Sequence, residues 1–165
     1  MTENDAAFIG YLAGLRNAEG SGALADLRRG LAGDPWNEIR MHRYVVPNLK
    51  DNMYPWDQKV YYMVAALFAS HPDSGGMGDL GDSMERLTGK TGSQSMESRF
   101  IALLSAHQDD LFDQLRHAIS LLKSKEIPVD WVQLCRDLRR WNDPDRRTQI
   151  KWSRSYWKSK KDEEE

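Results

Sequence analysis

The residues best placed to do chemistry in this sequence are four cations near the carboxyl end of the chain. Arg147, Lys151, Arg154 and Lys158 are spaced four, three and four residues apart. On a helix they form one stripe about 16 Å long, at a rise of about 1.5 Å per residue. A nucleic-acid backbone is a linear array of negative charge, which a rigid row of cations can follow. The stripe therefore predicts a nucleic-acid contact, with a solvated polar face as the alternative.

Three aromatic residues, Trp152, Tyr156 and Trp157, adjoin this stripe. Aromatic rings beside cations are typical of surfaces that stack unpaired bases. Rings at helical spacing are also typical of a face that packs in a core. The sequence leaves both interpretations open and favours the core.

Residues 131–141, which precede the stripe, divide into two faces when they are projected at the helical period. The apolar face, which we expect to be buried, consists of Trp131, Leu134, Leu138 and Trp141. The opposite face carries Arg136, Arg139 and Arg140. These arginines extend the predicted basic surface.

No combination of residues predicts catalysis. Gly89-Lys90-Thr91 lacks the earlier glycine of a phosphate-binding loop, since position 84 is methionine. The acidic residues of 107–113 are better explained as caps and helix-dipole partners than as a metal site. Cys135 has no histidine nearby in sequence. We expect no enzyme activity, no catalytic residue, no metal site and no cofactor.

The charge of the chain is unevenly distributed. The formal net charge is −2, and residues 1–55 and 56–125 are close to neutral. Residues 136–161 hold ten basic groups against three acidic ones. The basic groups are Arg136, Arg139, Arg140, Arg146, Arg147, Lys151, Arg154, Lys158, Lys160 and Lys161. The acidic residues 162–165 then form a tail that we expect to be solvated.

The elements that must position these groups are all helical. Apolar spacings of three and four recur along the chain, and no segment alternates as a half-buried strand does. We therefore expect an all-α fold of about eight to nine helices in two small bundles. The predicted parts are an amino-terminal lobe at 1–72, a Gly-rich connection with a short helix at 73–94, a carboxyl-terminal lobe at 95–161, and the acidic tail at 162–165. The apolar run at 60–69 predicts a central buried helix that has Pro55 in its first turn. The short helix is expected at about 82–88 with a break at Gly89, and Asp130 and Asp143 are predicted to cap the last two helices.

Composition places the chain among globular proteins. It has 165 residues, of which 40% are hydrophobic and 29% charged, enough apolar material for a packed core. The longest apolar run, residues 60–69, is too short for a bilayer span. The acidic start is unlike a secretory signal, and a single cysteine forms no internal disulfide. We expect a cytoplasmic protein with no membrane contact.

Four stretches, in order, resemble the small subunit of type I-E CRISPR Cascade complexes, the CasB family. They are 23–29 (ALADLRR), 63–72 (MVAALFASHP), 80–84 (LGDSM) with 98–104 (SRFIALL), and 128–141 (PVDWVQLCRDLRRW) followed by 152–157 (WSRSYW). Each alone is helical patterning, but the ordered set spans most of the chain. The chain is thereby identified as a member of that family.

The resemblance implies a two-lobed, non-catalytic subunit in an RNA-guided antiviral complex. Its neighbours would be the backbone subunits that coat the guide RNA and a second copy of itself. Its basic surfaces would help to hold the target and displaced DNA strands in the R-loop, without sequence specificity. The alternative function is a helical scaffold or adaptor with no nucleic-acid contact.

Family-like positions add a second set of candidate nucleic-acid contacts. These are Arg28, Arg29, Arg43, Arg99 and Arg116. They are implied by the resemblance, whereas the carboxyl-terminal cluster follows from charge alone.

Overall fold

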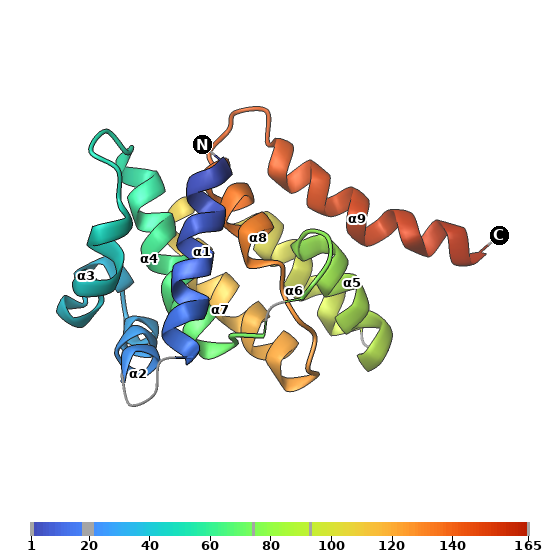
Figure 1. Ribbon diagram of the computed structural model, residues 1–165. Helices are drawn as coiled ribbons and strands as arrows, with labels where there is room; N and C mark the ends of the chain where they lie inside the picture. The colour runs from blue at the N-terminus through green and yellow to red at the C-terminus, as the bar shows by residue number, and fades with distance from the viewer. Residues whose placement is uncertain (1, 18–21, 74, 93, 165) are drawn as a thin grey trace. The chain divides into compact units, whose positions relative to one another are not determined.

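The structure, a computed structural model, describes residues 2–17, 22–73, 75–92 and 94–164, and for residues 2 and 159–164 only the backbone. Within these ranges the chain is helical and contains no strand (Figure 1), so the predicted all-α class is confirmed. The described α-helices are α1 (Thr2–Asn17), α2 (Ala23–Arg28), α3 (Ile39–Val45), α4 (Pro55–Ser70), α5 (Leu80–Thr91), α6 (Gln94–Leu104), α7 (Gln108–Ser124), α8 (Trp131–Arg139) and α9 (Arg147–Glu164). None of these helices is long and apolar enough to cross a membrane.

The chain divides into two compact units, Met1–Pro72 and Asp73–Glu165. The first is built around α4, which starts with Pro55 in its first turn and is buried from Val60 to Ala69. Proline suits a first turn because the missing N–H would have had no helical partner there. A helix that is apolar on every side must be surrounded by others. The predicted central helix is therefore confirmed.

A buried polar contact fixes α1 in the same unit. The Tyr61 hydroxyl donates to Asp5 Oδ1 at 2.8 Å, and the Tyr61 ring stacks on Phe8 with centroids 4.3 Å apart. Asp5 is 1% exposed, and a carboxylate at that depth needs such a donor. The amino-terminal helix is thus locked to α4 by both packing and hydrogen bonding.

The second unit contains a longer helix than the sequence suggested. We expected a short helix at 82–88 within a Gly-rich connection, but α5 extends from Leu80 to Thr91 and packs against α6, α7 and α9. Asp79 and Asp82 form a capping box, with bonds of 3.1 and 2.9 Å between each carboxylate and the other residue's N–H. This cap starts the helix early.

The expected break at Gly89 does not occur either. The helix continues through this glycine and ends at Gly92, whose φ of 63° is the left-handed conformation of a helix C-cap. A single glycine inside a helix costs only about 1 kcal/mol. The buried side chains of Met84 and Leu87 outweigh that cost.

Cap signals predicted for the later helices are confirmed in part. Asp109 and Asp110 lie in the first turn of α7, and Asp130 caps α8 by accepting from the Gln133 N–H at 3.0 Å. Asp143, predicted to cap the last helix, instead accepts from the Asp145 N–H in the preceding turn, and α9 begins only at Arg147. The acidic tail 162–165 is helical as far as Glu164, and its side chains lie outside the described residues.

Candidate nucleic-acid interface

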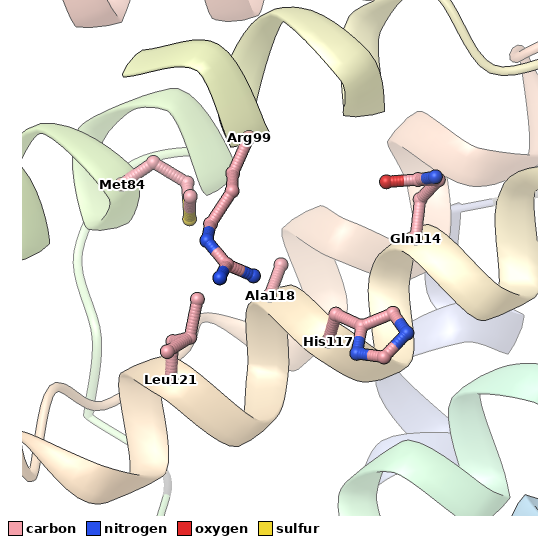
Figure 2. A pocket seen from close by; sticks show the side chains of 6 residues that line it. All are labelled: Met84, Arg99, Gln114, His117, Ala118 and Leu121. Atoms are coloured by element: carbon pink, nitrogen blue, oxygen red, sulfur yellow. The ribbon is translucent and has the colours of Figure 1, made fainter. Parts of the chain in front are cut away.

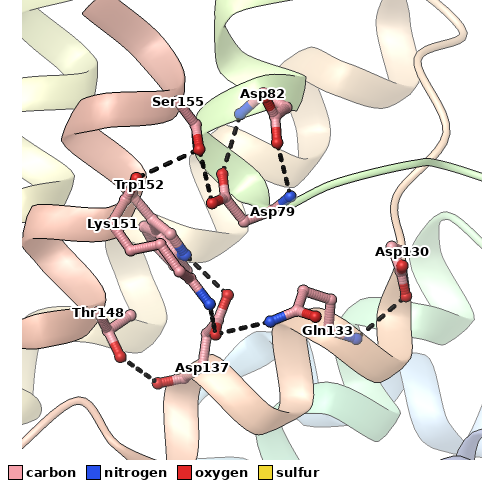
Figure 3. Close-up of polar contacts among 9 residues, drawn as sticks. All are labelled: Asp79, Asp82, Asp130, Gln133, Asp137, Thr148, Lys151, Trp152 and Ser155. Carbon is pink, nitrogen blue, oxygen red and sulfur yellow. Dashed lines mark hydrogen bonds and ion pairs between the residues drawn. The ribbon is translucent and has the colours of Figure 1, made fainter. Parts of the chain in front are cut away.

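The amino-terminal half of α9 is held to α8 by a buried carboxylate, Asp137 (Figure 3). The residue is 3% exposed, and its side chain accepts hydrogen bonds from Lys151 Nζ, from Trp152 Nε1 at 2.9 Å and from Gln133 Nε2 at 3.0 Å. The Thr148 hydroxyl donates to the Asp137 carbonyl at 3.1 Å. Three hydrogen-bond donors offset the free-energy cost of burying this carboxylate. The Lys151 ammonium therefore forms an ion pair within the chain.

The middle of α9 is held to α5. The Ser155 hydroxyl donates to Asp79 Oδ2 at 2.7 Å, as Figure 3 shows. Burial raises the pKa of the Asp79 carboxyl above its usual range, although the bonds from Ser155 and the Asp82 N–H oppose the shift. The backbones also approach closely, since a Cβ added at Gly81 would lie 2.2 Å from the Trp152 carbonyl oxygen.

Arg147, the first cation of the predicted stripe, also has carboxylate partners. Its guanidinium lies 3.0 Å from Asp145 and 3.6 Å from Asp143. These pairs are exposed, with 76% of the Arg147 side chain accessible, and such pairs are weak. Two of the four predicted stripe residues thus face acidic groups of this chain.

Arg154 and Lys158 differ from the first two stripe residues. Both are exposed, and within the described part of the chain neither makes a side-chain hydrogen bond or ion pair. Together with Ile150, Ser153 and Trp157 they line an open hollow of about 570 Å³. The stripe therefore presents two available cations beside a largely apolar depression.

The aromatic residues of α9 separate into core and surface. Trp152 and Tyr156 are both 0% exposed, so their packing in the core is confirmed and base stacking by them is excluded. Trp157 is partly exposed and lines the hollow. The predicted core face of α8 is confirmed as well, with Trp131 and Trp141 each 1% exposed.

The arginines of α8 and the following turn have mixed surroundings. Arg136 and Arg139 are half-buried, Arg140 is exposed, and the Arg136 Nε is buried without a hydrogen-bond partner in the described residues. Arg146 donates to the Leu104 carbonyl at 3.0 Å. That bond ties the turn before α9 to α6, so Arg146 serves the fold.

Arg99, from the second candidate set, lies in a separate cavity of the second unit (Figure 2). The cavity has a volume of about 240 Å³ and is lined by Met84, Arg99, Gln114, His117, Ala118 and Leu121. The Arg99 side chain extends from α6 into the space between α5 and α7. No acidic residue is among the lining side chains. Sequence reasoning missed Gln114 and His117, which share one face of α7 with Ala118 and Leu121.

The other residues of the second set are distributed over several helices. Arg28 donates to the Ala69 carbonyl at 3.4 Å, and Arg29 is exposed. The Arg43 guanidinium lies 5.5 Å from the Tyr44 ring centroid, while Arg116 pairs with Asp113 at 3.4 Å. Arg28, Arg29 and Arg43 belong to the first unit. The other ten of the thirteen candidates belong to the second unit.

Asp137 is a further residue whose role sequence reasoning missed. It lies three residues after Leu134 and one before Leu138, so it belongs to the apolar stripe of α8. An acidic residue in an apolar stripe signals a buried partner. That signal pointed to a cation on a neighbouring helix.

The described residues form no candidate metal centre. They contain no group of three His, Cys, Asp or Glu side chains able to hold a metal ion. Cys135 is 0% exposed, so its thiol lies in the core.

Comparisons with known proteins identify the family of this chain. The family described as CRISPR-associated protein Cse2 matches residues 23–157. A CRISPR-associated protein Cse2 from Thermus thermophilus is 35% identical over 162 residues, covering 96% of this chain and 92% of that protein. The crystal structure of CasB from Thermus thermophilus is 32% identical, with a TM-score of 0.84 over 93% of this chain and 97% of that one. A chain from a CRISPR RNA-guided surveillance complex is 25% identical, with a TM-score of 0.84 over 99% of both chains. The chain thus belongs to the Cse2 family of CRISPR-associated proteins.

Proposed function

We propose that this chain is a non-catalytic subunit of an RNA-guided CRISPR surveillance complex, where it binds DNA without reading its sequence and stabilises the R-loop. Membership of the Cse2 family and the similarity to a surveillance-complex chain support the proposal that this chain assembles into such a complex. The neighbours in this proposal are the guide-coating backbone subunits, a second copy of the chain, the guide RNA, and the target and displaced DNA strands.

The observation that carries the nucleic-acid part is the availability of Arg154 and Lys158. A phosphate that approaches Lys151 must compete with Asp137, whereas Arg154 and Lys158 have no competing carboxylate in the described residues. Cations that are already solvated exchange water and counterions for phosphate at little cost. Contacts of this kind follow the backbone and carry no sequence information.

Such contacts suit the energetics of an R-loop. The RNA–DNA duplex that forms is about as stable as the DNA duplex that it replaces. A few contacts with the DNA backbone are then enough to shift the balance, and they need charge rather than a reactive side chain. The remaining candidate arginines, including Arg28, Arg29 and Arg99, stay predictions for further contacts of this type.

The test compares two double variants in the assembled complex with its guide RNA. Arg154→Gln with Lys158→Gln removes the available cations, and Lys123→Gln with Lys125→Gln removes two exposed lysines of α7 and its end. Affinity for target DNA is measured over a range of salt concentrations. The first variant should lower the slope of log affinity against log salt by about 1.4, because each single-strand phosphate contact contributes about 0.7.

The matched lysine variant should keep the wild-type slope. If both variants keep it while remaining folded, the assignment to Arg154 and Lys158 is wrong. If in addition no crosslink forms between this chain and DNA in the complex, the scaffold or adaptor function replaces the one proposed.

A further inference from the structure

We infer that Trp157 is a base-stacking platform, on which one unpaired base of a single-stranded nucleic acid lies while its flanking phosphates contact Arg154 and Lys158. This inference rests on the proposed function and gives it a specific ligand: a single strand rather than a duplex. It follows from how the Trp157 ring is held, from its access to solvent, and from the groups around it.

The Trp157 ring is held in place from one side. Its Nε1 donates to Glu97 Oε1 at 2.8 Å, which ties the indole to α6. The Phe100 ring lies 5.4 Å away, tilted by 55°, and the Tyr156 ring lies 4.9 Å away in an edge-on arrangement. Because the side chain is already ordered, a ligand that stacks on it immobilises little further.

Trp157 is the accessible member of an otherwise buried aromatic group. Trp131, Trp141, Trp152 and Tyr156 are each at most 1% exposed. Trp157 instead lines the open hollow of about 570 Å³ on α9. The exposed part of the Trp157 ring is therefore the aromatic surface of α9 that a ligand reaches.

The surroundings of the ring select the ligand. Ile150 and Ser153 complete the hollow, and none of its lining residues is acidic. The Glu97 carboxylate, which accepts from Trp157 Nε1, is not among the lining residues. A nucleotide has a flat apolar base and a charged phosphate, and the hollow offers an indole face beside two cations. An acidic peptide would satisfy the cations but leave the indole unused. Every base has a π-face, so such a platform is tolerant of sequence.

A double helix cannot use this platform, because its bases are stacked on one another. The inference therefore predicts that binding depends on the presence of bases and not only on phosphates. An abasic strand of the same length keeps the phosphates and lacks the stacking partner, which makes it the matched ligand for the test.

The experiment measures fluorescence anisotropy of labelled strands of about 30 nucleotides with the full-length chain at low salt. We expect Trp157→Leu to weaken binding of the ordinary strand about 5- to 150-fold, the range that base stacking contributes. Trp157→Phe, which keeps an aromatic face, should bind within about threefold of wild type. Tyr54→Leu, at a residue that is 77% exposed in the first unit, is the control for loss of a surface aromatic ring.

The abasic strand separates stacking from charge. It should bind the wild type and Trp157→Leu equally, and the salt slope of Trp157→Leu should match the wild type because the phosphate contacts remain. Normal binding of the ordinary strand by folded Trp157→Leu overturns the platform. A wild type that binds both strands alike overturns it too, even where Trp157→Leu does not fold. In either case a lower salt slope of the Arg154 and Lys158 variant in the complex would leave the proposed function standing.

Discussion

Each half of α9 carries an arginine, a lysine four residues later and a tryptophan next to that lysine, but the two halves have different surroundings. In the first half, Lys151 and Trp152 both donate to the buried carboxylate of Asp137. In the second half, Arg154 and Lys158 make no side-chain ion pair in the described residues, and Trp157 lines an open hollow. The first half thus anchors α9 to α8, whereas the second half presents cations that are not paired with a carboxylate of the described residues.

This difference shows what a stripe of cations does and does not establish. Periodicity decides which side chains share a face of a helix. It does not decide whether a carboxylate on a neighbouring helix has already neutralised them. Asp137 makes that distinction here, since it lies on α8, 14 residues before Lys151.

Replacement of Asp137 should change the stability of the protein more than any other substitution considered below, because it removes the anchor of the first half of α9. Asp137→Ala leaves the Trp152 indole N–H buried without an acceptor and deprives Lys151 of its partner. We expect a loss of about 2–4 kcal/mol in the free energy of unfolding, measured with urea. Because the Lys151 ammonium is then available, the salt slope for single-stranded DNA should rise by up to about 0.7.

The control for this variant is Asp145→Ala, which removes an exposed partner of Arg147. It should cost at most about 1 kcal/mol. Equal losses in the two variants would show that the Asp137 network does not anchor α9.

Contact between α5 and α9 provides the next test. A Cβ at Gly81 would lie 2.2 Å from the Trp152 carbonyl oxygen, a backbone atom that cannot rotate away. Gly81→Ala should therefore destabilise the protein by about 1–3 kcal/mol. Gly89→Ala is the matched control in the same helix, where an added Cβ meets nothing within 4 Å. It should stabilise by about 0.5–1 kcal/mol, because alanine has the better helix propensity.

Urea unfolding of the two glycine variants measures both effects. The opposite signs are the essential result, since both substitutions add the same methyl group to α5. A Gly81→Ala variant as stable as its Gly89 counterpart would contradict the close packing of α5 on α9.

Much of the fold could be predicted from local sequence. The apolar run at 60–69 identified α4 as a central helix, and Asp130 was recognised as a cap of α8. Both are local signals, set by a few neighbouring residues. The extent of α5 was not predicted, because its glycines suggested loop and the stabilising contacts come from α6, α7 and α9. Packing of that kind leaves little trace in a short window of sequence.

The sequence predicts the basic surface of α9 but not which of its side chains are exposed. The basic character of α9 follows from composition. The exposure of Trp157 and the burial of its neighbour Tyr156 depend on where α6 places Phe100, whose ring stacks on Tyr156 with centroids 4.3 Å apart. Adjacent residues on a helix point about 100° apart, so one faces the core and the other does not. Which one does so is a tertiary property.

The last prediction concerns the pH dependence of stability and has the smallest magnitude. Asp79 accepts a hydrogen bond from Ser155, which lies where the two halves of α9 meet. Burial raises the pKa of the Asp79 carboxyl, so the folded state holds its proton more tightly than the unfolded chain does. The contribution of this group to stability is therefore greatest at low pH and falls as pH rises through the interval between its unfolded and folded pKa values. Asp79→Asn keeps an oxygen that accepts from the Asp82 N–H, places its amide NH2 beside the Ser155 hydroxyl, and does not titrate. Urea unfolding of both proteins across this acidic range should show the wild type losing stability relative to the variant as pH rises. A difference that is constant with pH, or that changes in the opposite direction, would mean that the Asp79 carboxylate is better solvated than its 8% exposure indicates, and that the border of α9 is looser than its anchored half.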